Sequence, residues 1–307
     1  MEPVEFSDFQ KFSLHRKVVA IEEVQVEIGR DWKIGQFAPD KDYRPETMTV
    51  WSFPDRGEWA THAGNYRGNW SPFIPRNLIL HYTEPGDVVL DQMVGSGTTL
   101  VECRLLGRHG IGVDVNVEAL MVTWDRLNFS YRPLEEDWVE PRIDVFHGDA
   151  RNLDLLRDDS VDLVATHPPY AGIIRYTGER VPGDLSALKL EDYLIEMRKV
   201  AAEAYRVTKP GKHCAILIGD TRQHKHYVPI SVRVLQQFLD VGFILREDII
   251  KLQHKMKSTR ERWGGSNYDF YLIAHEHLFV FRKPADGEKL SQYRHSIKWW
   301  ASQDAPP

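Results

Sequence analysis

Apolar runs of strand length alternate with stretches of helical length through most of the chain. The apolar runs occupy residues 87–92, 109–115, 143–149, 161–166 and 213–220. The helical stretches occupy residues 76–86, 95–107, 117–129, 191–207 and 228–242. Because buried strands that alternate with helices form parallel sheets covered on both faces, the pattern predicts an α/β fold.

The two ends of the chain follow other patterns. Two further apolar runs come after the last helical stretch, at 243–252 and 275–283, and predict two more strands. Residues 17–28 alternate between apolar and polar positions as one strand would, and polar, turn-prone residues follow them. We therefore predict an N-terminal extension over 1–65, a main domain over 66–284 and a tail over 285–307.

The composition is that of a globular protein. The 307 residues carry 39 Lys and Arg against 45 Asp and Glu, a formal net charge of −6. Apolar residues make up 42% and charged residues 27%, which excludes a mainly disordered chain. Two cysteines cannot make a disulfide framework, and the start of the chain lacks the pattern of a signal peptide. No apolar run reaches the roughly 18 residues of a membrane span, so we expect a cytoplasmic protein.

A glycine-rich turn joins the first strand of the main domain to the next helix. The strand ends at Asp91, and Gly95, Gly97 and Thr98 follow. Glycines let the backbone approach a ligand closely, and the free amide groups of a helix start favour a polar or anionic group. The spacing is not that of an ATP-binding phosphate loop, because the required Lys is missing. Such turns also occur as purely structural features.

Acidic residues end the next two strands as well. Asp114 lies in the sequence GVDVN and Asp149 in HGDA. Taken singly, each acid also fits a solvated or helix-capping residue. Because the carboxyl ends of parallel strands share one sheet edge, the three acids together indicate a ligand site there. Asp114 is placed to accept hydrogen bonds from a ribose diol.

The fourth strand ends abruptly in His167, Pro168, Pro169 and Tyr170. Two consecutive prolines fix φ and remove two backbone donors, so nearby carbonyls are held as acceptors beside an aromatic ring. This combination suits a planar base, whose face stacks on the ring while its exocyclic amino group donates to the oxygens. A rigid strand-to-loop turn with a partly buried tyrosine is the alternative interpretation.

The segments DxxxGSGTT, GVDVN, GDA and HPPY, in this order, resemble the motifs of one enzyme family. These are the S-adenosylmethionine-dependent DNA methyltransferases that methylate exocyclic amino groups, N4 of cytosine or N6 of adenine. The resemblance covers roughly residues 66–283. It implies a Rossmann-like methyltransferase fold with a mixed seven-stranded sheet, an antiparallel last strand and helices on both faces.

The resemblance also implies S-adenosylmethionine as the cofactor. Its amino-acid end would contact the glycine-rich turn, and its ribose would contact Asp114. A further cofactor-contacting segment precedes the first strand in family members. The implied cofactor-binding residues are Asn69, Trp70, Ser71, Asp91, Gly95, Gly97, Thr98, Asp114 and Asp149.

For catalysis, the resemblance implies that a DNA base is flipped out and that Tyr170 stacks on it. His167 and the Pro168 carbonyl then accept hydrogen bonds from the amino group of the base. Position 167 holds Asp, Asn or Ser in the family, and a histidine can accept only while its imidazole is neutral. We therefore expect the rate to fall as the pH drops through the usual histidine pKa of about 6.5.

The most specific expectation concerns which base is methylated. Thr166 matches the Thr that often precedes Ser-Pro-Pro-Tyr in cytosine-N4 members, which favours N4 of cytosine. An N6-adenine enzyme, an RNA base methyltransferase and a DNA-binding protein without catalysis are the alternatives. No segment of about 100 residues is left for a separate recognition domain, so recognition would come from loops or from the N-terminal part.

A basic segment, residues 251–265, separates the last two apolar runs. It holds Lys251, Lys255, Lys257, Arg260 and Arg262 against the single acid Glu261. Such residues pair with phosphates, and Trp263 beside two glycines is suited to stack on or wedge beside a base. We favour DNA binding by Lys255, Lys257, Arg260, Arg262 and Trp263 over a solvated loop.

Two other chemistries find little support in the sequence. Methylation of cytosine C5 needs a cysteine nucleophile, yet Cys103 falls in a helical stretch and Cys214 in a strand. The histidine pairs 224/226 and 275/277 have no third ligand nearby in the sequence. We therefore expect no metal site.

Overall fold

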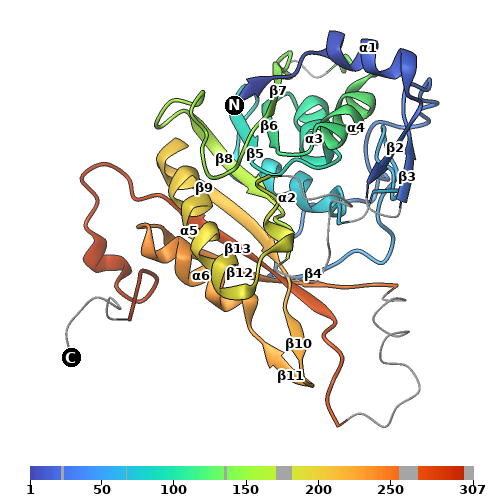
Figure 1. Cartoon of the computed structure of the whole chain (residues 1–307). Helices are drawn as coiled ribbons and strands as arrows, with labels where there is room; N and C mark the ends of the chain where they lie inside the picture. Colours follow the sequence, from blue (N-terminus) through green and yellow to red (C-terminus); the bar gives the residue numbers. More distant parts are fainter. Residues whose placement is uncertain (22–23, 67, 135–136, 171–181, 256–268, 301–307) are drawn as a thin grey trace.

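A mixed sheet forms the centre of the molecule (Figure 1). The computed structural model describes residues 1–307 apart from 22–23, 67, 135–136, 171–181, 256–268 and 301–307. Nine of the described strands form this sheet. In order across it they are β1 (Glu2–Pro3), β7 (Ile143–His147), β6 (His109–Asp114), β5 (Val88–Asp91), β8 (Val161–Thr166), β9 (Thr208–Ile218), β13 (His275–Arg282), β12 (Ile244–Leu252) and β4 (Val50–Ser52).

The direction of the strands agrees with the sequence. Strands β5 to β9 run parallel to one another, whereas β13 runs antiparallel to both of its neighbours, β9 and β12. Leu278 of β13 lies opposite Leu217 on one side and Ile249 on the other. The predicted Rossmann-like fold with an antiparallel last strand is confirmed. All seven predicted strands are present, and the N-terminal segment adds β1 and β4 at the two edges, so the sheet has nine described strands.

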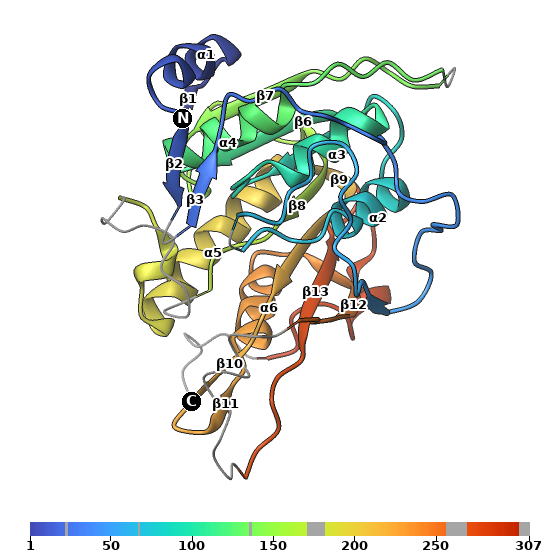
Figure 2. The same ribbon diagram turned by 90° about the vertical axis from the view of Figure 1, so that its right-hand side faces the viewer.

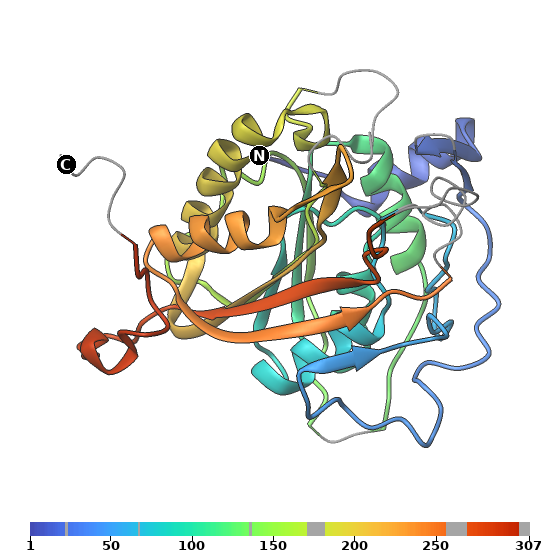
Figure 3. The ribbon, with the colours of Figure 1, turned by 90° about the horizontal axis from the view of Figure 1, so that it is seen from below.

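Helices cover both faces of the sheet. On one face lie α2 (Phe73–Tyr82), α3 (Thr98–Leu106) and α4 (Val117–Leu127), and on the other lie α5 (Leu190–Val207) and α6 (Ile230–Asp240). Figure 3 shows α5 and α6 in yellow and orange opposite α2 and α4 in cyan and green. The two cores come from the alternate residues of each strand, so Leu163 packs on the α2 side and Val164 on the α5 side.

Residues 6–21 and 24–27 pack beside α4 (Figure 2). They form α1 (Phe6–His15) and a two-stranded antiparallel sheet of β2 (Val18–Ile21) and β3 (Val24–Glu27). The sequence predicted one strand here, which was wrong. Val19 and Ile21 are buried at odd positions and Val26 at an even position. One straight strand would send these side chains to opposite faces, whereas two antiparallel strands bury them together.

The remaining elements are short. A hairpin of β10 (Thr221–Gln223) and β11 (His226–Val228) projects from the body below β9 (Figure 1). Two 3₁₀ turns, η1 (Leu185–Ala187) and η2 (Leu290–Tyr293), lie outside the sheet. Among the described residues, none of the helices combines the length and the apolar character needed to cross a membrane.

Candidate active site

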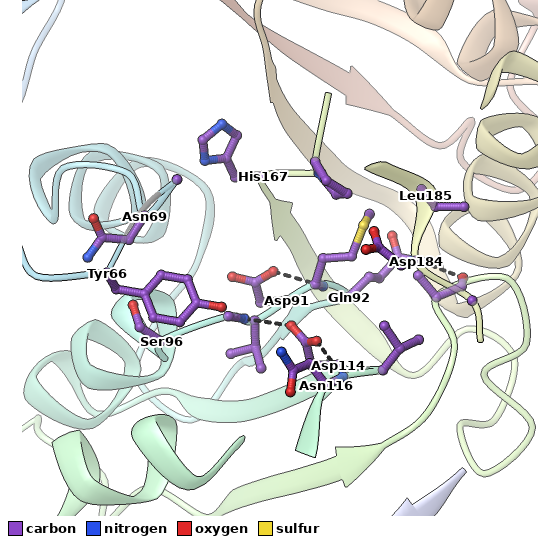
Figure 4. A pocket seen from close by; sticks show the side chains of 18 of the residues that line it. Tyr66, Asn69, Asp91, Gln92, Ser96, Asp114, Asn116, His167, Asp184 and Leu185 are labelled. Carbon is purple, nitrogen blue, oxygen red and sulfur yellow. Dashed lines mark hydrogen bonds between the residues drawn. The ribbon is translucent and has the colours of Figure 1, made fainter. Parts of the chain in front are cut away.

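A pocket lies at the carboxyl ends of β5, β6, β7 and β8 (Figure 4). The turn that follows each of these strands lines it, and so do two segments that come from elsewhere in the chain. One is the segment before α2, with Tyr66, Asn69 and Trp70, and the other is Gly183–Leu185 at the start of η1. Open α/β sheets bind ligands at this edge.

Nine of the thirteen residues predicted for cofactor binding and catalysis line this pocket. They are Asn69, Trp70, Asp91, Gly95, Thr98, Asp114, Asp149, His167 and Pro169. The other predicted residues near it are Ser71, Gly97, Pro168 and Tyr170, which are not part of its lining. Four further lining residues were not predicted, namely Tyr66, Gln92, Asp184 and Leu185. Gln92 occupies a variable position of the DxxxGSGTT segment, and the other three reach the pocket through the fold.

The glycine-rich turn is shaped by two left-handed residues. Gly95 has φ of +53° and its N–H donates to Asp114 Oδ2 at 2.9 Å, which ties the turn after β5 to the end of β6. Gly97 has φ of +81° and begins α3. A Cβ on Gly97 would lie 2.9 Å from the Thr123 methyl, so this glycine lets α3 pack on α4. Gly97 is not part of the pocket lining, and its contact with the cofactor stays a prediction.

Asp91 is held by hydrogen bonds inside the protein. Its Oδ2 accepts from the Thr99 hydroxyl at 2.5 Å, and its Oδ1 accepts from the Thr166 hydroxyl at 3.1 Å and from the Met93 N–H at 3.2 Å. The side chain is buried, and burial raises the pKa of Asp91 to about 6 against the lowering effect of these bonds. Thr166, which the sequence linked to the target base, thus supports the turn.

Asp114 is oriented by backbone amides. Its two oxygens accept from the N–H groups of Gly95 and Asn116, each at 2.9 Å. Burial raises the pKa of Asp114 to about 6, while these two bonds lower it. The carboxylate lies at the end of β6 and faces the pocket (Figure 4), where its remaining lone pairs can accept from hydroxyl groups of a ligand.

Asp149 differs from the other two acids because it is paired with a cation. Arg151 Nε donates to Asp149 Oδ1 at 2.8 Å, and Arg151 Nη1 donates to Glu196. Burial raises the pKa of Asp149, but the Arg151 guanidinium lowers it more, and the net shift is downward. The carboxylate therefore stays ionised, and most of its acceptor capacity is directed at Arg151.

The segment before α2 brings an aromatic ring beside His167. The Trp70 and His167 rings are nearly parallel, at 18°, with centroids 5.9 Å apart. The Trp70 carbonyl accepts from Arg56 Nη2 at 2.9 Å, and the Asn69 amide donates to the Ala63 carbonyl at 3.0 Å. Ser71 instead bonds the Arg56 carbonyl at 2.7 Å, outside the pocket lining.

The HPPY segment follows β8, and its tyrosine is turned into the protein. The Tyr170 side chain packs against Gly219, the whole residue is 8% exposed, and its hydroxyl donates to Glu276 Oε1 at 2.8 Å. Tyr170 OH also lies 2.8 Å from His167 Nε2. The stacking role of Tyr170 stays a prediction, and this buried position favours a supporting role instead.

The environment of His167 overturns the expected pH dependence. Burial lowers the pKa of His167 to about 4, and the nearby Lys251 ammonium acts in the same direction. Glu276 and the Gly68 carbonyl act in the opposite direction but are weaker than burial. The imidazole is therefore neutral at all pH values well above 4, and the expected loss of the acceptor near pH 6.5 was wrong.

The sequence missed Glu276 and Lys251 as parts of this site. Glu276 lies in β13 among the inward-facing positions, between His275 and His277, and is 7% exposed. Its Oε2 is 2.8 Å from Lys251 Nζ of β12. Glu276 alternates with the apolar residues Leu278 and Val280 along β13, and an acid on this buried face was the signal that could have found it.

Most of the basic segment, residues 251–265, falls outside the described residues. Lys257, Arg260, Arg262 and Trp263 fall outside the described residues, and their DNA-binding role stays a prediction. Lys255 is exposed and lies 3.2 Å from Asp55. Lys251 belongs to β12 and is paired with Glu276, so counting it in a basic loop was wrong.

Within the described part of the chain, no group of three or more candidate metal ligands occurs, and the expectation of no metal site stays a prediction. His277 Nδ1 lies 3.0 Å from Asp248 Oδ1. This carboxylate raises the pKa of His277, so His277 is an ion-pair partner.

Several known proteins share parts of this sequence. The type II methyltransferase M.MthZI of Methanothermobacter thermautotrophicus is 29% identical over 160 residues, 45% of this chain and 44% of that protein. The type II beta methyltransferase M.BslI of a Bacillus species is 25% identical over 177 residues, 50% and 18% of the two chains. A tRNA (guanine(10)-N2)-dimethyltransferase of M. thermautotrophicus is 32% identical over 116 residues, 38% and 32%. The chain spans less than half the length of each of these relatives.

Among solved structures, TrmN from Thermus thermophilus aligns with a TM-score of 0.46 at 19% identity, covering 71% of this chain and 50% of that one. A family model described as DNA methylase, of the N6 and N4 type, matches residues 12–123 and 161–304, which is most of the chain. The resemblance stated from the motifs is thereby confirmed. This chain belongs to the DNA methylase family of N6- and N4-type, S-adenosylmethionine-dependent amino-methyltransferases.

Proposed function

We propose that this protein transfers a methyl group from S-adenosylmethionine to an exocyclic amino group of a DNA base. The strongest support is that the predicted cofactor-binding residues and the predicted catalytic residues lie at the same edge of the sheet. There the glycine-rich turn and Asp114 lie beside the HPPY segment, and His167 lines the same pocket as Asp91 and Asp114. A methyl donor and a base held at this edge would be next to each other.

The pocket residues fit S-adenosylmethionine. Thr98 Oγ1 is buried at the pocket, and the described residues offer it no hydrogen-bond partner. Such an atom can bond the charged amino-acid end of the cofactor, whose ammonium would be close to the carboxylate of Asp91. Asp114 can accept from the ribose hydroxyls. We assign Gly97 to the packing of the turn.

In this reaction the protein would position the target amino group beside the methyl group and accept hydrogen bonds from that amino group. The cofactor supplies an electrophilic methyl group on a sulfonium. His167 and the carbonyl at Pro168 accept from the amino group of the target, which orients the nitrogen lone pair toward the methyl group. Such a transfer would form a bond from the amino nitrogen to the methyl carbon, break the bond from that carbon to sulfur to leave a neutral thioether, and release one amino proton to solvent, with no covalent intermediate on the protein. The neutral state of His167 is the state that this role requires.

We favour N4 of cytosine as the target, on the single ground that Thr166 and His167 occupy the positions of the Thr-Ser pair in cytosine-N4 enzymes. N6 of adenine is the closest alternative. Because one relative is a tRNA dimethyltransferase that matches over 116 residues, an RNA base is the second candidate substrate.

One experiment separates these candidates. The purified protein is incubated with tritiated S-adenosylmethionine and either duplex DNA, single-stranded DNA or RNA, and the nucleosides are then identified by mass spectrometry. N4-methylcytosine in DNA supports the whole proposal, and N6-methyladenine corrects only the base. Methylation confined to RNA replaces the substrate. Cofactor binding without transfer to any of the three would support a binding protein that has lost catalysis.

A further inference from the structure

A buried chain of polar side chains ends on His167. Lys251 Nζ of β12 lies 2.8 Å from Glu276 Oε2 of β13. The other oxygen of Glu276, Oε1, accepts from Tyr170 OH at 2.8 Å, and Tyr170 OH lies 2.8 Å from His167 Nε2. Three elements of the fold thus converge on one nitrogen of the imidazole, and Glu276 and Tyr170 are both at least nine-tenths buried.

The protons that Glu276 and Tyr170 carry decide which ring nitrogen of the neutral His167 is protonated. Glu276 is acceptor-only while it is ionised. Burial raises the pKa of Glu276, but the Lys251 ammonium and the other bonds lower it more, so the carboxylate stays ionised. Tyr170 has a single hydroxyl proton, which it donates to Glu276. The contact between His167 Nε2 and Tyr170 is then a hydrogen bond only if Nε2 donates.

The other tautomer is poorly accommodated. The Gly68 carbonyl raises the pKa of the ring, yet His167 Nδ1 makes no hydrogen bond with any described residue, so a proton on Nδ1 would have no acceptor. That tautomer would leave a lone pair on Nε2 pointing at the Tyr170 oxygen across 2.8 Å, while the Tyr170 proton is held by Glu276. Two facing lone pairs repel each other, so the Nε2–H tautomer is favoured.

The consequence is a free acceptor on the opposite side of the ring. His167 Nδ1 is buried, and among the described residues it has no hydrogen-bond partner. An unsatisfied buried acceptor is destabilising, and a donor from a bound ligand would relieve this. His167 itself lines the pocket that holds Asp91 and Asp114.

We propose that Glu276 and Tyr170 are positioning residues that fix the Nε2–H tautomer of His167, so that Nδ1 accepts the hydrogen bond from the amino group of the target base. This inference rests on the proposed function and deepens it. Glu276 takes the part that a buried carboxylate plays when it sets the tautomer of a histidine through a hydrogen-bond chain. A fixed Nε2–H tautomer also explains how a histidine can replace the Asp, Asn or Ser of the family at position 167.

The titratable and charged groups around the imidazole agree with this assignment. Glu276 from β13, Lys251 from β12 and Tyr170 from the HPPY segment face the ring. Above a pH of about 4 the ring is neutral, so the choice between the two tautomers, and not its protonation, controls the acceptor.

The first test reads the tautomer directly and needs no activity. Protein labelled with ¹⁵N-histidine is studied by two-bond ¹H–¹⁵N NMR, and the His167 signals are identified by their absence from the His167→Asn variant. We expect an unprotonated Nδ1 in the native protein. In Glu276→Gln, the amide can donate to Tyr170, whose proton then turns to Nε2, and the proton of the ring moves to Nδ1. A protonated Nδ1 in the native protein would overturn the inference, whether or not methyl transfer occurs.

The second test uses the rate of methyl transfer. Glu276→Gln and Tyr170→Phe should lower kcat about a hundredfold, in the range of a lost acid–base contact, while KM for S-adenosylmethionine stays the same. Asp248→Asn is the matched control, because it removes a β12 carboxylate that pairs with a β13 histidine away from His167. It should leave kcat unchanged. Tyr170→Phe removes one oxygen only, so it tests the chain even if Glu276→Gln unfolds.

A double-variant cycle separates positioning from a purely structural role. The amide oxygen of Asn can accept in place of Nδ1 and needs no tautomer, so the rate of His167→Asn, at whatever level, is the reference for the second substitution. Adding Glu276→Gln to His167→Asn should then cost little further activity. An equal loss from Glu276→Gln in both backgrounds would show a structural role and would contradict the proposal. If native protein methylates neither DNA nor RNA, the proposed function fails, while the NMR result still decides the tautomer.

Discussion

At the scale of single residues, the hydrogen-bond partners of a side chain decide its role more than its amino-acid type does. Three acids end successive strands, and the sequence treated them alike. In the structure Asp91 is engaged by side-chain hydroxyls, Asp114 by backbone amides and Asp149 by Arg151. Asp114 keeps the acceptor capacity that a ribose needs, whereas Asp149 is committed to a guanidinium.

The first prediction concerns Asp114 as the ribose-binding residue. Asp114→Ala should weaken binding of S-adenosylmethionine by about 1–3 kcal/mol, the usual effect of losing a hydrogen bond to a charged group. Isothermal titration calorimetry measures this. Asp144→Ala is the control, because Asp144 lies on the neighbouring strand β7 and pairs with Arg142 away from the pocket. Equal affinity in Asp114→Ala and native protein would remove Asp114 from the site.

The second prediction concerns pH. Asp91 and Asp114 have pKa values raised to about 6, so both gain protons as the pH falls below 6 and cofactor binding weakens. The pKa of His167 is lowered to about 4, so its acceptor survives over the same interval. Between pH 7 and 5, KM for S-adenosylmethionine should therefore rise while kcat at saturating cofactor stays nearly constant. A kcat that falls with a midpoint near 6.5 would show that His167 titrates normally.

At the scale of elements, the glycine-rich turn lines the pocket and also brings α3 against α4. The third prediction is that Gly97→Ala destabilises the fold, because φ of +81° costs about 1–2 kcal/mol for a residue with a Cβ. The added Cβ would also meet Thr123 at 2.9 Å. Urea unfolding measures the loss. Gly287→Ala is the matched control, since φ is +72° there and nothing lies within 4 Å of the new Cβ.

The excess destabilisation of Gly97→Ala over Gly287→Ala isolates the contact between α3 and α4. Equal effects of the two substitutions would mean that only backbone strain matters and that the α3–α4 distance can adjust. The comparison needs no knowledge of the ligand, so it tests the turn independently of the proposed function.

Elements with a long periodic pattern were predictable from the sequence, and short ones were not. The strands β5, β6 and β8 and the helices α5 and α6 have enough alternating or amphipathic positions to be read from the chain alone. Strand β1 has two residues and β4 has three, so neither carries a period, and both exist because a neighbouring strand offers an edge.

The candidate site was predictable where its residues follow a strand and unpredictable where they meet across the sheet. Asp91, Asp114 and His167 follow β5, β6 and β8, and parallel strands bring such residues together. Glu276 reaches His167 only because β13 inserts antiparallel between β9 and β12. The burial of Tyr170 depends in turn on the small Gly219 at the end of β9. No local pattern encodes either contact.

At the scale of the whole molecule, the proposed function requires a negatively charged protein to bind a negatively charged polymer. The formal net charge is −6, so binding to DNA requires that positive side chains gather on the face that holds the pocket. The basic segment before β13 is the strongest cluster in the sequence. Its residues 256–268 lie outside the described part of the chain, and the prediction rests on composition and on its place between β12 and β13.

The last prediction tests this segment through the dependence of binding on salt. Each phosphate contact releases counterions, and the slope of log K against log[salt] is about −0.9 per contact for duplex DNA. Replacing four cations by Gln should weaken DNA binding and flatten the slope by up to about 4 × 0.9 if all four contact phosphates. The four are Lys255, Lys257, Arg260 and Arg262. Fluorescence anisotropy with a labelled duplex at several salt concentrations measures both quantities.

The control for this variant must remove the same charge from another place. Four cations of the N-terminal part serve this purpose, namely Lys11, Lys33, Lys41 and Arg44. Their removal changes the net charge equally, so it shifts the general repulsion from DNA but should leave the salt slope nearly unchanged. Affinity for S-adenosylmethionine should stay constant in both variants, because neither set lines the pocket. Equal slopes for the two variants would mean that net charge alone acts, and the basic segment would then be a solvated surface with no direct phosphate contacts.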